Sequence, residues 1–423
     1  MDQSHNDQDR FAALVGLDWA DQEHAGALCT AAEGTLEAFK LPQTPDAIEQ
    51  WAAGLRRRFS GRPVAICLEQ SKGALVYALL KYDFIVLFPV NPKQLARFRE
   101  AMVSSGAKDD PGDAMLLLEL LRKHRQQLRA WQPDDVTTRL IGQLAEDRRN
   151  LVDYGTRLSN TLKSRLKQYF PLALEVLGEL DKELACQFLL RWPTFEELRS
   201  AEPAEIAAFY RTWRCYHPRL IEERLETIRQ AMPLVNDPAV IESGRRLVQC
   251  LARQLLDLLE PLARYDRRLT ELMQRHPDAA VFESFPGAGE VMAPRLLAAF
   301  GTDRQRFKSA ADMQSLSGAA PVTRASGKTR AVLRRWACNK FLLQTFHEFA
   351  QHSMGRSAWA KTYYDQARRK GKRHHAAVRA LAFKWIRILY RCWQNRTLYN
   401  EAFYFQQLQR KGSRLVASIS SQT

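Results

Sequence analysis

Three short segments decide the fold of the N-terminal part of this chain: VGLDWA (15–20), ICLEQSKG (66–73) and KDDPGDA (108–114). The first two continue apolar runs that are typical of buried strands, and each run ends in a carboxylate, Asp18 or Glu69. Sheets of α/β proteins place their ligands at the carboxyl ends of their strands. Two carboxylates from neighbouring strands can hold a hard divalent ion such as Mg²⁺, whereas a solvated strand end explains either residue taken alone.

The third segment predicts the start of a helix that carries two more carboxylates. We expect Asp110 to cap this helix, with Pro111 at the first helical position and Asp113 in the first turn. Asp110 and Asp113 are three residues apart and share a helix face, where they repel each other unless a cation or a proton lies between them. Asp109 competes for the first position because it stands four residues before Asp113. The segment alone is consistent with a structural cap and with half of a metal site.

The order of the predicted elements around these segments indicates an α/β domain over residues 1–130. Strands are predicted at 11–18, 25–31, 36–41, 63–68 and 84–90, and helices at 47–59, 72–81, 94–102 and 114–128. Three strands, then helices alternating with strands, imply a mixed sheet with right-handed crossovers. Asp18 follows the first strand, Glu69 follows the fourth, and the aspartate pair lies on a late helix. This arrangement resembles the D-E-D-D layout of an RNase H-like (RuvC-like) fold.

Residues 131–280 are predicted to be entirely helical. Apolar residues recur at steps of three, four and seven over 144–169 and again over 241–272, which predicts two long amphipathic helices in an antiparallel coiled coil. Between them, residues 171–238 are expected to form a helical insertion of shorter, proline-punctuated helices. We interpret the apolar stripes as packing seams and not as a cofactor site.

The charge of the chain is concentrated in its last third. The 423 residues carry a formal net charge of +16, made up of +18 over 281–423 and −1 in each of 1–130 and 131–280. A basic region with many aromatic residues favours a nucleic-acid-binding surface over a merely solvated one. Seven scattered cysteines without a CxxC pair indicate reduced thiols, and no run is apolar enough to span a bilayer. With no secretory leader evident, we expect a cytoplasmic, nucleoid-associated prokaryotic protein.

Residues 281–410 are predicted to form a mainly α domain, followed by a loose tail at 411–423. The segment FPGAGE (285–290) before a helix is typical of a helix–hairpin–helix, in which Gly287 and Gly289 allow close approach of a phosphate backbone; a plain interhelical turn fits equally well. Helices are predicted over 331–351, 357–370 and 374–391. Further candidate nucleic-acid contacts are the basic residues Arg334, Arg335, Arg368, Arg369, Lys370, Lys372 and Arg373.

A Ser-Gly pair, Ser326-Gly327, is predicted to lie in a loop of this domain. Its neighbours Arg324, Lys328 and Arg330 could hold a scissile phosphate while the Ser326 hydroxyl attacks it. A serine before a glycine is usually only a turn, so the residues alone do not select Ser326 as a nucleophile.

Taken together, these segments resemble the DEDD-type transposases of insertion sequence family 110, the bridge-RNA-guided recombinases. The similarity rests on the three segments above together with NPKQLARFREA (91–101), FPGAGEVMAPRLLAAFG (285–301), LSGAAPVTRASGK (316–328) and the basic helices that follow. It extends over nearly the whole chain, and the order and spacing of the segments carry more weight than any one of them.

The resemblance implies a RuvC-like domain, a coiled-coil middle and a C-terminal transposase domain. It assigns a Mg²⁺ site to Asp18, Glu69, Asp110 and Asp113, and a serine nucleophile that forms a 5′-phosphoserine link to DNA to Ser326. It also implies a noncoding guide RNA that pairs with target and donor DNA, and a tetramer in which protomers share active sites. The chain departs from the family pattern at Pro111-Gly112, at the extra Asp109, at the large insertion 171–238, and at Lys328-Thr329, where Thr329 becomes a rival nucleophile.

The sequence therefore predicts a Mg²⁺-dependent, RNA-guided DNA transposase or recombinase. One alternative is a RuvC-like, structure-selective nuclease that cuts DNA with water and has no protein–DNA link. A second is a non-catalytic nucleic-acid-binding protein with a degenerate RNase H-like domain.

Overall fold

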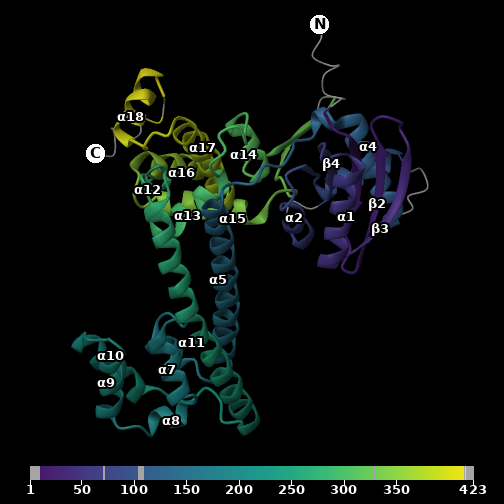
Figure 1. Ribbon diagram of the computed structural model, residues 1–423. Helices are drawn as coiled ribbons and strands as arrows, with labels where there is room; N and C mark the ends of the chain where they lie inside the picture. Colours follow the sequence, from purple (N-terminus) through teal and green to yellow (C-terminus); the bar gives the residue numbers. More distant parts are fainter. Residues whose placement is uncertain (1–9, 70–71, 103–108, 328, 414, 416–423) are drawn as a thin grey trace. The chain divides into compact units, whose positions relative to one another are not determined.

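The computed structural model describes residues 10–69, 72–102, 109–327, 329–413 and 415. The chain divides into two compact units, residues 1–133 and 134–423, which are described separately below (Figure 1). Whether the second unit holds two separate domains, as the sequence suggested, stays a prediction. Among the described residues no helix is both long and apolar enough to cross a membrane.

The first unit is built on a mixed five-stranded sheet in the order β3-β2-β1-β4-β5. Its strands are β1 (Ala13–Asp18), β2 (Glu23–Thr30), β3 (Leu36–Pro42), β4 (Val64–Leu68) and β5 (Ile85–Pro89). The first three strands pair in antiparallel fashion, and β4 and β5 then continue the sheet parallel to β1. The predicted order of elements is confirmed, and each strand lies within two residues of its predicted limits.

Helices cover both faces of this sheet: α1 (Pro45–Arg58), α2 (Ala74–Leu79), α3 (Pro92–Met102) and α4 (Asp110–His124), followed by a 3₁₀ turn at Arg125–Gln127. Alternate residues of β1 and β4, such as Val15 and Ile66, pack with α1 and α2 in one core. The intervening residues, such as Cys67, pack with Leu117 of α4 in a second core. The site-bearing helix α4 therefore lies on one defined face of the sheet.

Two long helices form the stem of the second unit, α5 (Val136–Tyr169) and α11 (Pro238–Arg275). They run in opposite directions, because Arg148 pairs with Asp266 whereas Arg165, further along α5, donates a 2.9 Å hydrogen bond to Ser243. The predicted antiparallel pair of long helices is thus present, and its description as a coiled coil stays a prediction.

The insertion between these helices folds around its own apolar core at one end of the stem. Its helices are α6 (Leu172–Leu177), α7 (Glu183–Arg191), α8 (Phe195–Arg199), α9 (Pro203–Thr212) and α10 (Pro218–Gln230). Tyr169 at the end of α5 is buried there and donates a 2.7 Å hydrogen bond to the carbonyl of Pro193. Such a satisfied hydroxyl fixes the insertion to the stem.

The other end of the stem is covered by the C-terminal helices, which enclose an aromatic core around Trp359, Trp385 and Trp393. These helices are α12 (Ala279–Glu283), α13 (Gly289–Phe300), α14 (Ala310–Leu316), α15 (Lys340–Ser353), α16 (Ala358–Arg369), α17 (His374–Asn395) and α18 (Glu401–Arg410). The loose tail predicted at 411–423 lies mostly outside the described residues, although Leu415 is buried in this core.

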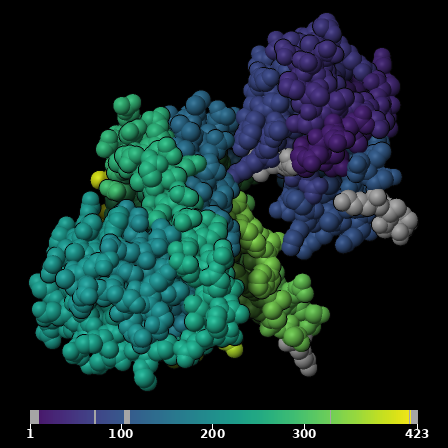
Figure 2. Space-filling view, turned by 90° about the horizontal axis from the view of Figure 1, so that it is seen from below, coloured from purple at the N-terminus to yellow at the C-terminus, as the bar shows by residue number. Residues whose placement is uncertain are grey.

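The predictions of a loop at Ser326 and of a helix from 331 to 351 were wrong in their limits. A β-hairpin, β6 (Val322–Ser326) and β7 (Thr329–Leu333), occupies this segment, and α15 begins only at Lys340. The short Gly327-Lys328 connection, with Gly327 at φ +53°, favours a tight hairpin turn, and Asn339 caps α15 through its 3.0 Å contact with the backbone N–H of Leu342. Figure 2 shows the hairpin, in light green, standing out from the body of this unit.

Candidate functional site

The carboxylates Asp18 and Glu69 come from the same edge of the sheet. Strands β1 and β4 are parallel neighbours in which Leu17 is paired with Leu68. Asp18 directly follows Leu17, and Glu69 directly follows Leu68; both side chains are half-buried. Neighbouring parallel strands therefore deliver the two carboxylates side by side, as the sequence predicted.

Asp18 belongs to the face that α4 covers. A Cβ on Gly16 would stand only 2.0 Å from the carbonyl oxygen of Ala114, so α4 packs directly on the backbone of β1 at this glycine. Side chains alternate along a strand, so Asp18 follows Gly16 on the same face. Its strand partner Ala25 also packs in the small core beneath α4. On the neighbouring strand β4, Cys67, two residues before Glu69, packs against α4 as well.

The start of α4 corrects one prediction. The N-cap is Asp109, not Asp110: its backbone is extended, at φ −143° and ψ 156°, and its carboxylate accepts a 2.7 Å hydrogen bond from the N–H of Gly112. The helix accordingly begins one residue earlier than expected, with Asp110 as its first residue and Pro111 as its second. Because Asp109 is engaged as the cap, the exposed Asp110 and the buried Asp113 are left as the pair on this helix.

The fourth carboxylate, Asp113, is 3% exposed and is neutralised by an arginine. Arg99 of α3 approaches Asp113 Oδ1 with its Nε at 2.7 Å and its Nη2 at 2.5 Å. A buried carboxylate needs such a partner, because an unpaired buried charge is strongly destabilising. Arg99 was not singled out from the sequence; its only signal there was its place in the segment 91–101. Within the described ranges no three metal-binding side chains lie close enough together to form an ion site.

The candidate nucleophile Ser326 lies at the tip of the exposed hairpin, at the end of β6, where it pairs with Thr329 of β7. Arg324 shares the face of Ser326, because the two are separated by one residue on the same strand. Arg330 pairs with Ala325 and therefore belongs to the opposite face. Lys328, the third predicted cation, lies outside the described residues.

Comparison with known proteins places this chain in a family. A sequence model for DEDD-type IS110 transposases matches residues 15–171, and one for transposases of the IS116/IS110/IS902 family matches residues 279–365. The mini-circle putative transposase for IS117 of Streptomyces coelicolor is 30% identical over 415 residues, which cover 95% of this chain and 98% of the relative. The chain belongs to the IS110 family of DEDD-type transposases.

Two other relatives of this transposase match most of the chain. The insertion element IS110 uncharacterized 43.6 kDa protein of Streptomyces coelicolor is 26% identical over 93% of this chain and 96% of its own length. The insertion element IS900 uncharacterized 42 kDa protein of Mycobacterium paratuberculosis is 29% identical over 70% of this chain and 73% of its own length. Membership in the family makes the protein an insertion-sequence transposase, an enzyme that binds, cuts and rejoins DNA.

Seven further predicted nucleic-acid residues of the transposase fall into two groups. One follows the hairpin: the guanidinium carbon of Arg334 lies 4.2 Å from the ring centroid of the exposed Trp336, while Arg335 donates to the carbonyl of Ala320 at 3.2 Å. The other is the turn between α16 and α17, which carries the exposed residues Arg368, Arg369, Lys370, Lys372 and Arg373. Both groups remain predicted nucleic-acid contacts.

The two glycines before α13 differ in their surroundings. Gly287, at φ +80°, packs against α15, because a Cβ there would stand 2.8 Å from the backbone carbon of His352. Gly289, at φ +51°, has open space around it and is exposed. Gly287 thus has a packing role inside the transposase in addition to any phosphate contact, and Gly289 is the more accessible of the two.

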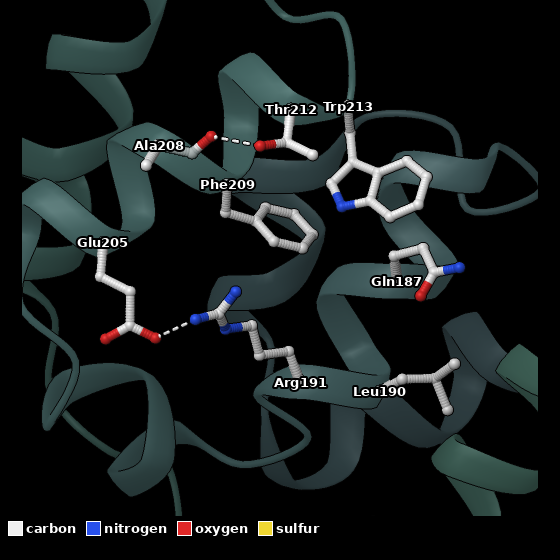
Figure 3. A pocket seen from close by; sticks show the side chains of 8 residues that line it. All are labelled: Gln187, Leu190, Arg191, Glu205, Ala208, Phe209, Thr212 and Trp213. Carbon is white, nitrogen blue, oxygen red and sulfur yellow. Dashed lines mark hydrogen bonds and ion pairs between the residues drawn. The ribbon is translucent and has the colours of Figure 1, made fainter.

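A hollow of about 510 Å³ lies on the insertion, between α7 and α9 (Figure 3). Phe209 and Trp213 form one side of it, and the ion pair of Arg191 with Glu205 closes one end. This hollow was not predicted from the sequence. Its charged groups neutralise each other, so it lacks the excess positive charge that a phosphate site of the transposase needs.

Proposed function

We propose that this IS110-family transposase cuts and rejoins DNA through a Mg²⁺-dependent acidic site and a covalent serine intermediate, guided by a noncoding RNA. The observation that carries the proposal is the position of Asp18 and Glu69 at the carboxyl ends of two adjacent parallel strands, with Asp18 on the face that α4 covers. The 3-2-1-4-5 strand order, with β2 antiparallel, supports an RNase H-like assignment of this unit.

The acidic residues suit a hard divalent cation. Carboxylate oxygens are the ligands that Mg²⁺ prefers, and a few of them suffice because the ion keeps several waters. Asp18, Glu69, Asp110 and Asp113 would hold the ion, which when bound would stabilise charge on the scissile phosphate. Arg99 occupies Oδ1 of Asp113, so Asp113 would contribute to the set through its other carboxylate oxygen or after Arg99 moves away. Asp109 stays outside the set as the cap of α4.

In the proposed reaction the Ser326 Oγ attacks the scissile phosphorus. A P–O bond forms to Ser326 as the bond to the 3′ oxygen breaks; the serine proton is lost, and the leaving 3′ oxygen gains a proton. A new 3′ hydroxyl then attacks the phosphoserine, which joins the strands and restores the serine. Arg324, on the same hairpin face, would stabilise the charge that develops on the phosphate.

Ser326 has no acidic or histidine neighbour on its own hairpin, and we propose that it reacts only when docked on an acidic site. Following the family resemblance, that site would come from another protomer of a tetramer. The guide RNA would bind mainly to the basic last third of the chain, whose net charge is +18.

The test of the chemistry is a covalent adduct. Incubation with a nicked suicide substrate and Mg²⁺ should give a protein–DNA species that survives SDS and maps to Ser326 by mass spectrometry. Ser326→Ala should lose the adduct and still bind DNA, whereas Thr329→Ala should keep it. Asp18→Asn with Glu69→Gln should lose both the adduct and the heat of Mg²⁺ binding in calorimetry.

Two results would overturn these assignments. Cleavage by Ser326→Ala with free 5′-phosphate ends would identify a water-using nuclease, and an adduct on Thr329 would move the nucleophile. Guidance is tested separately, by sequencing the RNA that copurifies with the protein when its flanking DNA is supplied. Recovery of random cellular RNA alone would count against a guide.

A further inference from the structure

A second hollow, of about 380 Å³, lies between α15 and α17 near the base of the hairpin, and most of its charged lining is basic. Its lining residues are Arg334, Lys340, Leu343, Gln344, His347, Glu348, His375 and Arg379. None of the functional groups assigned above lies in this hollow except Arg334, which follows the hairpin.

The one acidic residue of the lining is already neutralised. Glu348 Oε2 is bound by Arg295 of α13, and its Oε1 lies 3.3 Å from Arg149 of α5. By contrast, neither Lys340 nor Arg379 has a carboxylate partner among the residues that the structure describes. Lys340 instead donates a 2.9 Å hydrogen bond to the carbonyl of Trp336. The hollow therefore holds an excess of positive charge with no internal anion to balance it.

The two histidines of the hollow face each other. His347 Nε2 and His375 Nδ1 are 3.4 Å apart, and the rings lie 5.3 Å apart. Burial, and then the nearby His375 and Arg379, lower the pKa of His347 to about 4. Burial, and then Arg334, also lower the pKa of Arg379. An anion in the hollow would relieve both effects, because it favours the charged forms of these groups.

The backbone adds to this preference for an anion. α17 begins at His374, and its first turn has no capping side chain from Arg373. Free N–H groups and the helix dipole favour negative charge at this end of a helix. His375 brings this end of α17 to the hollow.

We propose that this hollow binds a phosphodiester group of the DNA strand on which Ser326 acts, with the exposed Trp336 against a neighbouring base. The proposal rests on the proposed function for its choice of strand. β7 runs from Thr329, opposite Ser326, to Leu333 just before Arg334. At the usual rise per strand residue this is about 13 Å. That length spans about two nucleotides if it is the direct distance between two phosphates, and about four if β7 runs along the axis of the DNA. The bound phosphate thus lies about two to four nucleotides from the scissile one.

The test is a charge-interference binding assay. It uses Ser326→Ala protein with its copurified RNA, so that no strand is cut, and DNA in which single phosphates two to six nucleotides from the cut are replaced by neutral methylphosphonates. One position in this window should weaken binding about tenfold. Adding Arg379→Gln should weaken binding to unmodified DNA to a similar extent, lower the salt slope by about 1, and abolish the sensitivity at that position.

The matched control is Arg391→Gln, which removes the same charge from an exposed position further along α17. It should leave the position-specific interference intact, and His375→Gln provides a second pocket variant should Arg379→Gln melt early. Equal effects of Arg379→Gln and Arg391→Gln, or interference spread evenly over the window, would refute the pocket. Interference found on methylphosphonate RNA and not on DNA would refute the DNA assignment. The cut position is mapped from product ends, so the assay stands even if Ser326 fails as the nucleophile.

Discussion

Replacing Gly16 by alanine should disable the acidic site without touching a carboxylate. The new Cβ would lie 2.0 Å from the carbonyl oxygen of Ala114 and 2.4 Å from the backbone nitrogen of Leu118, whereas real Cβ contacts essentially never fall below 3.0 Å. Both atoms belong to the backbone of α4, so no side chain can turn away. The helix must therefore move off β1 by at least about 1 Å, an overpacking that costs about 1–3 kcal/mol.

The same movement displaces Asp113, which directly precedes Ala114 on α4. A misplacement of about 1 Å in a catalytic arrangement can cost about 100-fold in rate, so we expect strand transfer by Gly16→Ala to fall by that order. Activity is measured below the melting transition and normalised to the folded fraction from circular dichroism. This separates misplacement from unfolding.

Gly54→Ala is the matched control. Gly54 lies in α1, no heavy atom stands within 4 Å of its added Cβ, and its φ is not positive. Alanine there should stabilise the helix by about 0.5–1 kcal/mol and leave activity unchanged. If Gly16→Ala kept wild-type strand transfer and melting temperature, this would refute the inference that direct packing of α4 on β1 positions the acidic residues.

Three further predictions follow from the same regions. Asp109→Ala should lower stability by about 1 kcal/mol through the lost cap yet retain strand transfer, whereas Asp110→Ala should lose transfer with little change in melting; the reverse pattern would exchange their roles. Arg99→Gln leaves Asp113 buried without its cation. In EDTA the free energy of unfolding of this variant should fall by about 3–5 kcal/mol, and its melting temperature with it, and Mg²⁺ should restore both. No recovery would argue against an ion at Asp113. His347 has a pKa near 4 when folded and an ordinary value of 6.5. The unfolded chain therefore takes up a proton first as pH falls, and the free energy of unfolding should drop between about pH 6.5 and 4. The expected drop is about 1–3 kcal/mol after allowance for solvent screening. Denaturant titration should show a smaller drop in His347→Gln.

The acidic edge of the sheet could be predicted because its signals are local. An apolar run that ends in a carboxylate marks both the strand and its rim, which is why Asp18 and Glu69 could be placed at strand ends from the residues alone. The expectation that the two strands are neighbours came from the resemblance to the RNase H-like layout. The identity of the cap was missed because Asp109 and Asp110 are equally good capping residues, and a shift of one residue leaves the pattern unchanged. Arg99 was missed because its partnership with Asp113 depends on how α3 packs beside α4, which no spacing encodes.

The hairpin was missed for a different reason. Residues 329–333 precede a strongly amphipathic helix, and the apolar Ala331, Val332 and Leu333 extend its pattern backwards. A strand pair forms there in place of a longer helix because Gly327 allows a tight turn, which sets Ser326 opposite Thr329. Both strands are largely exposed, so burial gave no alternating pattern to recognise.

The net charge of the last third overstates the surface available to nucleic acid. Arg304 and Arg306 pair with Asp278 and Asp134, two acidic residues that lie outside the last third and are not counted in its net charge. These arginines hold the fold together and release no counterions when DNA or RNA binds. In a plot of log K for binding against log salt concentration, each phosphate contact contributes about −0.9 to the slope. The slope should therefore reflect the number of exposed cations at the hairpin base and in the α16–α17 turn. Its magnitude should be well below the value that +18 charges would give. A slope near that larger value would mean that the buried pairs open on binding.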